Sequence, residues 1–237
     1  MKKIIWLLVL VAVVFGAKQY LSGGGSLPGM APPRFENPYP ASSPLHAQHQ
    51  AFVDRANADE GLRKRFAGII SSKGLYAELK LALMRGAHSL EGPLLINATR
   101  AMAAVIPRLP ERSCAKLMRP RDDFDPELER DARAAFERLP SRHHQNFLEF
   151  YLRALQAEVH DAPKVRADPQ ARERALRHLG EAYPGVFGER LAGVLRDPRR
   201  ASDEDACWAI NSMTHTATQL DPESAEALSR LLWGGEG

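Results

Sequence analysis

Residues 141–160 read SRHHQNFLEFYLRALQAEVH and form the strongest amphipathic pattern in the chain. Apolar residues recur in this stretch at helical spacing, and three aromatic residues widen the stripe: Leu148, Leu152, Leu155 and Val159, with Phe147, Phe150 and Tyr151. A stripe of this width is typical of a helix that buries one whole face in a core. We therefore expect a core-facing helix over these residues.

The pattern on either side of this stretch is also helical. Further apolar stripes comprise Leu75, Leu79 and Leu83; Leu94, Ala98, Met102 and Val105; Ala206, Ile210, Met213, Ala217 and Leu220; and Leu228, Leu231 and Leu232. We find no strand-like alternation of useful length and no Asn-Gly or Asp-Gly hairpin signal. Residues 46–237 are therefore expected to form one all-α domain, an irregular multi-helix bundle of about eight helices without a fixed repeat.

Five positions carry the pattern of a helix start. Asp125, Asp168 and Asp221 each precede a proline, so a capping carboxylate is followed by a residue suited to the first helical position. Ser141 and Ser202 are further expected caps, because serine hydroxyls accept hydrogen bonds from the first free backbone N–H groups of a helix.

The first 21 residues have the composition of an export signal or a membrane anchor. Two lysines precede an apolar run from Ile4 to Ala17. This run is shorter than the roughly 17–25 residues that a membrane-spanning helix needs, which favours a cleaved signal. Cleavage after Ala17, however, would place the bulky Phe15 where small residues are required, which favours a retained anchor.

These observations predict where the protein works. We expect residues 1–21 to be a signal-anchor that spans the bacterial inner membrane once, through residues 4–21, with the C-terminal domain in the periplasm. A soluble periplasmic or secreted protein, released by cleavage, is the alternative. Residues 22–45 contain three consecutive glycines and six prolines. They are expected to form a flexible linker, because such a composition can neither bury apolar area nor carry a helix.

The charge of the chain does not favour nucleic acid as a partner. The chain has 32 Lys and Arg against 29 Asp and Glu, and three of the cations are Lys2, Lys3 and Lys18. Beyond residue 18 the numbers of basic and acidic residues are equal. A nucleic-acid-binding domain would be basic, so we expect no nucleic acid partner.

The chain has two cysteines, Cys114 and Cys207. Two cysteines of one domain in an oxidising compartment usually pair, so a disulfide between them is expected. A reactive thiol or a metal ligand is the alternative, but neither cysteine lies in a C-x-x-C pair or beside a histidine.

The stretch from Trp208 to Gln219 is rich in uncharged polar residues, whereas a solvated helix face usually carries Lys and Glu. The residues of a possible interface or groove are Trp208, Asn211, Thr214, His215 and Thr218. The alternative is a buried helix whose hydroxyls bond to the preceding turn.

No catalytic constellation stands out. Ser113 and Lys116 match the S-x-x-K nucleophile motif of β-lactamases, but no K-T-G or S-D-N motif follows. The histidines lack the spacing of a zinc site. We therefore assign no catalytic residue and expect no metal and no cofactor.

The function expected from these features is that of a membrane-tethered protein-binding module of the bacterial envelope, of the chaperone, inhibitor or immunity, or secretion-accessory type. Its partner would be an envelope protein. The alternative is an envelope hydrolase that acts on peptidoglycan or lipid, with catalytic residues far apart in the sequence.

Overall fold

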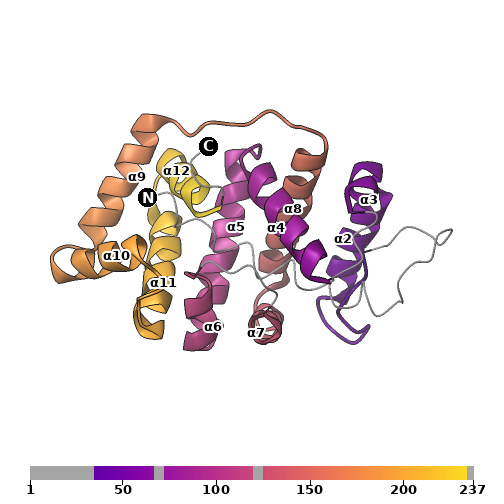
Figure 1. The fold of residues 1–237 in the computed structure, drawn as a ribbon, viewed down its shortest axis with the longest axis horizontal. Helices are drawn as coiled ribbons and strands as arrows, with labels where there is room; N and C mark the ends of the chain where they lie inside the picture. The colour runs from indigo at the N-terminus through magenta and orange to yellow at the C-terminus, as the bar shows by residue number, and fades with distance from the viewer. Residues whose placement is uncertain (1–34, 67–71, 120–124, 234–237) are drawn as a thin grey trace.

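The fold is given by a computed structural model, which describes residues 35–66, 72–119 and 125–233 (Figure 1). Within these ranges the chain forms eleven α-helices and one 3₁₀ turn, with no strand. The elements are α2 (His46–Ala58), α3 (Glu60–Phe66), α4 (Ser72–Ala87), α5 (Gly92–Val105), η1 (Ile106–Arg108), α6 (Glu111–Lys116), α7 (Pro126–Glu137), α8 (Ser141–Val159), α9 (Pro169–Ala182), α10 (Val186–Arg196), α11 (Asp203–Gln219) and α12 (Pro222–Trp233).

The all-α prediction is confirmed, but the expected number of about eight helices was too low. Two of the additional helices, α3 and α6, contain only 7 and 6 residues. A helix of this length makes fewer than two turns. Its apolar residues therefore cannot repeat often enough to produce a recognisable period in the sequence.

Most of the expected helix caps are present. The side chains of Asp125, Asp168 and Asp221 each accept hydrogen bonds from two backbone N–H groups at the start of α7, α9 and α12. Ser202 caps α11. The cap predicted at Ser141 is wrong: Pro140 occupies the N-cap position of α8 in an extended conformation, and Ser141 is the first helical residue.

Helix α8 (Ser141–Val159), which matches the predicted core-facing helix, lies at the centre of the fold. It packs against α4 and α5, and α5 in turn packs against α11 and α12. Figure 1 shows α5 and α8 in the middle of the molecule, with α9, α10 and α11 at one end and α2 and α3 at the other. Phe150 and Leu152 are fully buried, which confirms the core-facing prediction.

The core extends into residues 35–45, ahead of the boundary at residue 46 that the sequence suggests. Tyr39 and Leu45 are almost completely buried. The backbone N–H of Phe35 donates to Asn57, and its ring contacts Phe66 edge to face. This part of the expected linker therefore packs on the domain.

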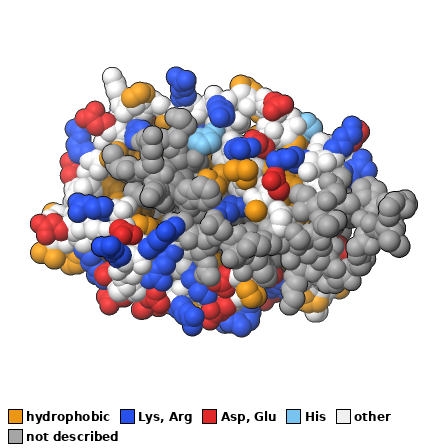
Figure 2. Space-filling view, viewed as in Figure 1, with side chains coloured by type: hydrophobic (Ala, Val, Ile, Leu, Met, Phe, Trp, Pro, Cys, Tyr) orange, Lys and Arg blue, Asp and Glu red, His pale blue; other side chains and the backbone are white. Residues whose placement is uncertain are grey.

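The expected anchor and residues 22–34 of the linker lie outside the described residues. Among the helices that the structure describes, none has the length and apolar character required to cross a bilayer. The visible surface carries Lys and Arg side chains interspersed with Asp and Glu, without a large area of one sign (Figure 2). This mixture agrees with the equal numbers of acidic and basic residues beyond residue 18.

Candidate protein-binding face around Trp208

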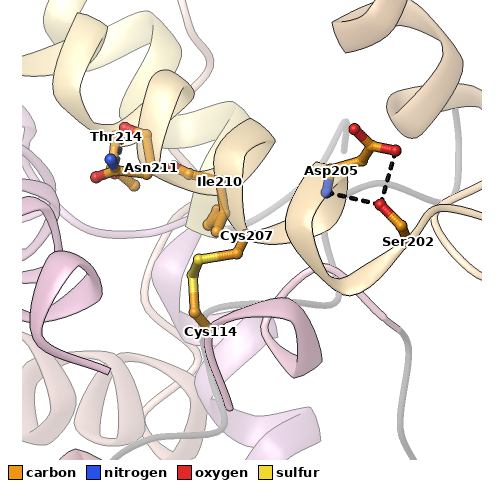
Figure 3. Close-up of a disulfide and its surroundings, with 7 residues drawn as sticks. All are labelled: Cys114, Ser202, Asp205, Cys207, Ile210, Asn211 and Thr214. Carbon is orange, nitrogen blue, oxygen red and sulfur yellow. Dashed lines mark hydrogen bonds between the residues drawn. A yellow bond between two sulfur atoms is a disulfide. The ribbon is translucent and has the colours of Figure 1, made fainter. Parts of the chain in front are cut away.

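The disulfide between Cys114 and Cys207 fixes the position of the candidate site. The two α-carbons are 5.0 Å apart, and the bond joins α6 to the first turns of α11 (Figure 3). The pairing predicted from the sequence is thus confirmed. Cys114 is fully buried, whereas Cys207 is partly exposed. Trp208, the residue that follows Cys207, is also partly exposed and packs against the core.

The start of α11 is ordered by a reciprocal pair of hydrogen bonds. The hydroxyl of Ser202 accepts from the backbone N–H of Asp205 at 3.0 Å and donates to the Asp205 carboxylate at 2.8 Å (Figure 3). The hydrogen bond from Ser202, and then that from Arg190, lowers the pKa of Asp205. Asp205 is therefore a carboxylate at neutral pH, and it stabilises the positive end of the helix dipole.

The structure separates the five residues predicted for the interface. Trp208, Asn211, His215 and Thr218 lie on one side of α11, at least partly exposed. Thr214 is fully buried, and its hydroxyl donates to the carbonyls of Ile210 and Asn211 at 2.9 and 3.2 Å. The residue types alone did not distinguish Thr214 from the four residues of the outer side.

Trp208 is the centre of an aromatic cluster. Its ring lies 5.5 Å from the ring of Tyr183, edge to face, and 6.3 Å from the ring of Phe187. The guanidinium of Arg190 lies over the indole, 4.7 Å from the ring centroid. This distance is within the range of a cation–π interaction, which adds about 0.5–1 kcal/mol at an exposed site.

Arg190 is fixed in this position by two carboxylates. It donates to Asp205 and, at 3.0 Å, to Glu204. The hydrogen bond to Asp205 is the main cause of the raised pKa of Arg190. A guanidinium that bridges α10 to α11 in this way holds the indole in one orientation before any partner binds.

The turn between α9 and α10 is followed by two exposed apolar side chains, and the second of them, Phe187, contacts the ring of Trp208. Gly185 has a φ of 60°, a conformation that is easily adopted only by glycine. A side chain at Gly188 would collide with the carbonyl of Tyr183. This tight turn leaves Val186 77% and Phe187 57% exposed.

A shallow hollow of about 290 Å³ lies against Trp208, bordered by η1 and α6. Pro107, Leu109 and Asn211 contribute to its walls, with Glu111 and Glu204 at its edge. Of the predicted residues, only Trp208 and Asn211 belong to this hollow. We define the Trp208 face as Tyr183, Val186, Phe187, Arg190, Trp208 and Asn211.

Four members of the Trp208 face were missed by the sequence reasoning: Tyr183, Val186, Phe187 and Arg190. One signal was present, since Tyr183-Pro184-Gly185 marks a turn and two apolar residues follow it directly. Helical periodicity aligns Phe187 with the buried Leu191, one turn later. The exposure of Phe187 could therefore not be derived from the pattern.

The S-x-x-K residues do not form a catalytic pair. The hydroxyl of Ser113 donates to Asp131 at 2.6 Å, whereas the ammonium of Lys116 pairs with Asp125 at 3.0 Å and with Glu127. Both residues are buried in α6. They connect α6 to α7 and its N-terminal cap.

Comparisons with protein-family models, with curated proteins and with solved structures found no match for this chain. Within the ranges that the structure describes, no group of three or more His, Cys, Asp or Glu side chains is arranged to hold a metal ion.

Proposed function

We propose that this chain is a protein-binding module of the bacterial envelope, tethered to the inner membrane through residues 1–21, and that it binds an envelope protein through the Trp208 face. The observation that carries the proposal is the exposure of Phe187, which contacts the ordered cluster of Trp208, Tyr183 and Arg190 and follows the exposed Val186 in the chain.

The residue types of this face are those that dominate binding energy. Trp, Tyr and Arg are enriched among the residues whose truncation costs an interface the most. When a partner covers an apolar side chain such as Phe187, the removal of its surface from water favours binding. The favourable free energy is about 25 cal/mol per Å² of apolar area.

The order already present in the face supports the same conclusion. Arg190 is bonded to two carboxylates, and the turn before Val186 is constrained by Gly185 and Gly188. Side chains that are fixed before association lose less conformational entropy when a partner binds, so more of the contact energy appears as affinity.

The charges around the face indicate the chemistry of the partner. Glu111, Glu189 and Glu204 are exposed in the neighbouring helices. Glu111 and Glu204 border the hollow beside Trp208, and Glu204 is already bonded to Arg190. Glu111 therefore favours a partner that places a Lys or Arg beside the apolar contact, because complementary charges speed association and exclude acidic competitors.

Site-specific photo-crosslinking in intact cells tests the face. A photoreactive residue at position 187 of the full chain is expected to give one discrete adduct with an envelope protein. Position 64 is the matched control, because Lys64 is exposed and lies in α3, at the opposite end of the molecule from α10 (Figure 1). Equal adducts from both positions, or none from position 187, would contradict the proposal.

Substitution of the apolar pair provides the second readout. The double variant Val186→Ser/Phe187→Ser is expected to lose the adduct partner in co-purification. Its stability should stay within about 0.5 kcal/mol of the wild type, because both side chains are exposed. Lys64→Ser should retain the partner.

The tether is tested separately by fractionation. Full-length chain in the membrane pellet after carbonate extraction supports an anchor. A shortened chain in the soluble fraction would contradict the anchor and support cleavage, without affecting the test of the Trp208 face.

A further inference from the structure

A second site lies beneath the connection between α8 and α9. This connection, residues 160–168, runs in an extended path across the top of the molecule (Figure 1). It is fastened to the loop after α4, because the N–H of Val165 donates to the carbonyl of His88 at 2.8 Å and the hydroxyl of Ser89 donates to the carbonyl of Ala162 at 2.9 Å.

The connection, α9 and α12 enclose a hollow of about 770 Å³. A hollow of this size lies within the range of about 300–1,000 Å³ that is usual for small-molecule sites. It is separate from the Trp208 face, and its lining residues do not include any member of that face.

The lining combines positive charge with apolar surface. Lys164, Arg166, Arg172 and Arg230 contribute cations, and Glu173 is the one carboxylate among the described residues that line the hollow. Val165 and Leu176 also line the hollow and are 42% and 40% exposed, which is unusual for large apolar side chains in this structure.

Arg230 supports the hollow and does not need a ligand. It is 8% exposed, and it donates to Glu226, to the carbonyl of Leu90 at 2.8 Å and to the carbonyl of Val165 at 3.5 Å. A buried guanidinium is stable when its donors are satisfied in this way.

Lys164 and Arg166 differ from Arg230. Both are exposed, and neither forms an ion pair with any residue in the part of the chain that the structure describes. Two unpaired cations beside exposed aliphatic side chains form a surface that complements an anion with an apolar chain.

We propose that this hollow binds an anionic amphiphile, a single aliphatic chain that ends in a carboxylate or a phosphate. The head group is held by Lys164 and Arg166 through charge-assisted hydrogen bonds. The aliphatic chain covers Val165 and Leu176, and this contact removes their apolar surface from water.

Photo-labelling of the full chain in phosphatidylcholine nanodiscs tests the proposal. The probe is a decanoate that carries a diazirine, and the labelled residues are located by mass spectrometry. Labels should concentrate on residues 164–167 and on α9 and α12. Labelling spread over all exposed residues of the domain would overturn the proposal.

Competition identifies the chemistry. Excess decanoate or decyl phosphate should suppress the labelling, and the stronger competitor identifies the head group as carboxylate or phosphate. Acetate, which lacks the chain, and decyltrimethylammonium, which carries the opposite charge, should leave it unchanged. If acetate or decyltrimethylammonium suppressed the labelling as strongly as decanoate or decyl phosphate, the proposed ligand would be contradicted.

Two sets of variants complete the test. Lys164→Glu/Arg166→Glu should reduce labelling roughly tenfold or more, since it removes two charge-assisted contacts. The control Lys64→Glu/Arg200→Glu changes the net charge equally at two highly exposed positions outside the hollow. Equal labelling of Lys164→Glu/Arg166→Glu and of Lys64→Glu/Arg200→Glu would overturn the proposal.

The variant Val165→Ser/Leu176→Ser retains the cations and should also weaken labelling.

Discussion

Gly86 in α4 lies directly against the main-chain carbonyl of Ala154 in α8, so closely that a β-carbon at position 86 would overlap that oxygen. Glycine is therefore required at this helix crossing for its lack of a side chain. Gly86→Ala is expected to lower the free energy of unfolding by roughly 1–3 kcal/mol, as overpacking of a core does. Chemical denaturation measures this change.

Two other helical glycines are matched controls for Gly86. A β-carbon at Gly180 or Gly193 would meet no atom within 4 Å. Gly180→Ala and Gly193→Ala are expected to raise stability by roughly 0.5–1 kcal/mol, because alanine loses less backbone entropy than glycine in a helix. Destabilisation of the same size at all three positions would contradict the conclusion that the close contact with Ala154 makes glycine necessary at position 86.

The disulfide between Cys114 and Cys207 spans 93 residues of sequence. Cys114→Ala/Cys207→Ala is expected to lower the free energy of unfolding by roughly 2–5 kcal/mol, because the unfolded chain regains the freedom that the crosslink removes. A reductant should shift the denaturation midpoint of the wild type and leave that of the double variant unchanged. The reductant is added while the chain is unfolded, so that it can reach the disulfide. An unchanged denaturation midpoint of the wild type after this treatment would contradict the pairing.

Buried histidines are expected to make the fold sensitive to acid. The rings of His49 and His144 stack with their centroids 5.7 Å apart, among Tyr39, Phe52 and Phe136. Burial, and then the charge of His144, lowers the pKa of His49 to about 3. Burial lowers the pKa of His144 to about 4.

Both pKa values are lower in the folded than in the unfolded chain, where they are near 6.5. Between these values the unfolded chain binds more protons, so the free energy of unfolding falls as the pH falls, by up to about 1.4 kcal/mol per pH unit for each histidine. Above pH 6.5 both histidines are neutral in the folded and the unfolded chain, so they cause no loss of stability. Below pH 6.5 the free energy of unfolding falls, until the pH reaches the folded-state pKa values of about 4 for His144 and about 3 for His49. Denaturation at pH 7, 6 and 5 measures the slope.

His144→Asn should flatten this slope because asparagine does not titrate. Asn211→Ala is the control, because Asn211 is partly exposed on α11 and carries no ionisable group, so its substitution should leave the slope unchanged. Parallel pH profiles for the wild type and His144→Asn would show that the buried pair does not determine the acid response.

Thr99 connects α5 to α12 through a buried chain of hydrogen bonds. The indole N–H of Trp233 donates to the Thr99 hydroxyl at 2.9 Å, and Ser229 lies 2.9 Å from the same oxygen. Thr99→Val keeps the shape but leaves buried polar groups without partners, which costs about 1–3 kcal/mol. Thr99→Ser retains the hydroxyl and should cost less. Greater destabilisation by serine would indicate that the methyl group, and not the network, matters at this position.

Much of the local structure was predictable because it depends on residues close together in sequence. The aspartates before Pro126, Pro169 and Pro222 cap their helices because the carboxylate reaches N–H groups only two and three residues away. The burial of Phe150 could be predicted because the apolar face of residues 141–160 is wide enough to be covered on all sides by other helices. The one wrong cap prediction also had a local cause, because Pro140 occupies the N-cap position of α8 in place of Ser141.

The candidate sites were less predictable because each joins segments that are distant in sequence. Trp208 could be identified as unusual, but its neighbours Tyr183 and Arg190 come from the end of α9 and from α10, and no pattern in α11 predicts them. Thr214 was grouped with Trp208 by residue type, although the orientation of α11 places its hydroxyl inside.

The sequence by itself determined that this protein is helical, where several helices begin and that its two cysteines should pair. These properties arise from backbone hydrogen bonding and side-chain periodicity within each segment, together with the small number of partners available to a cysteine. Only the tertiary structure decided that Val186 and Phe187 remain exposed at the start of α10, with Phe187 against Trp208, and that the residues around Val165 border a basic hollow. Both results depend on which surfaces are left uncovered after the helices pack, and that outcome is a property of the whole domain.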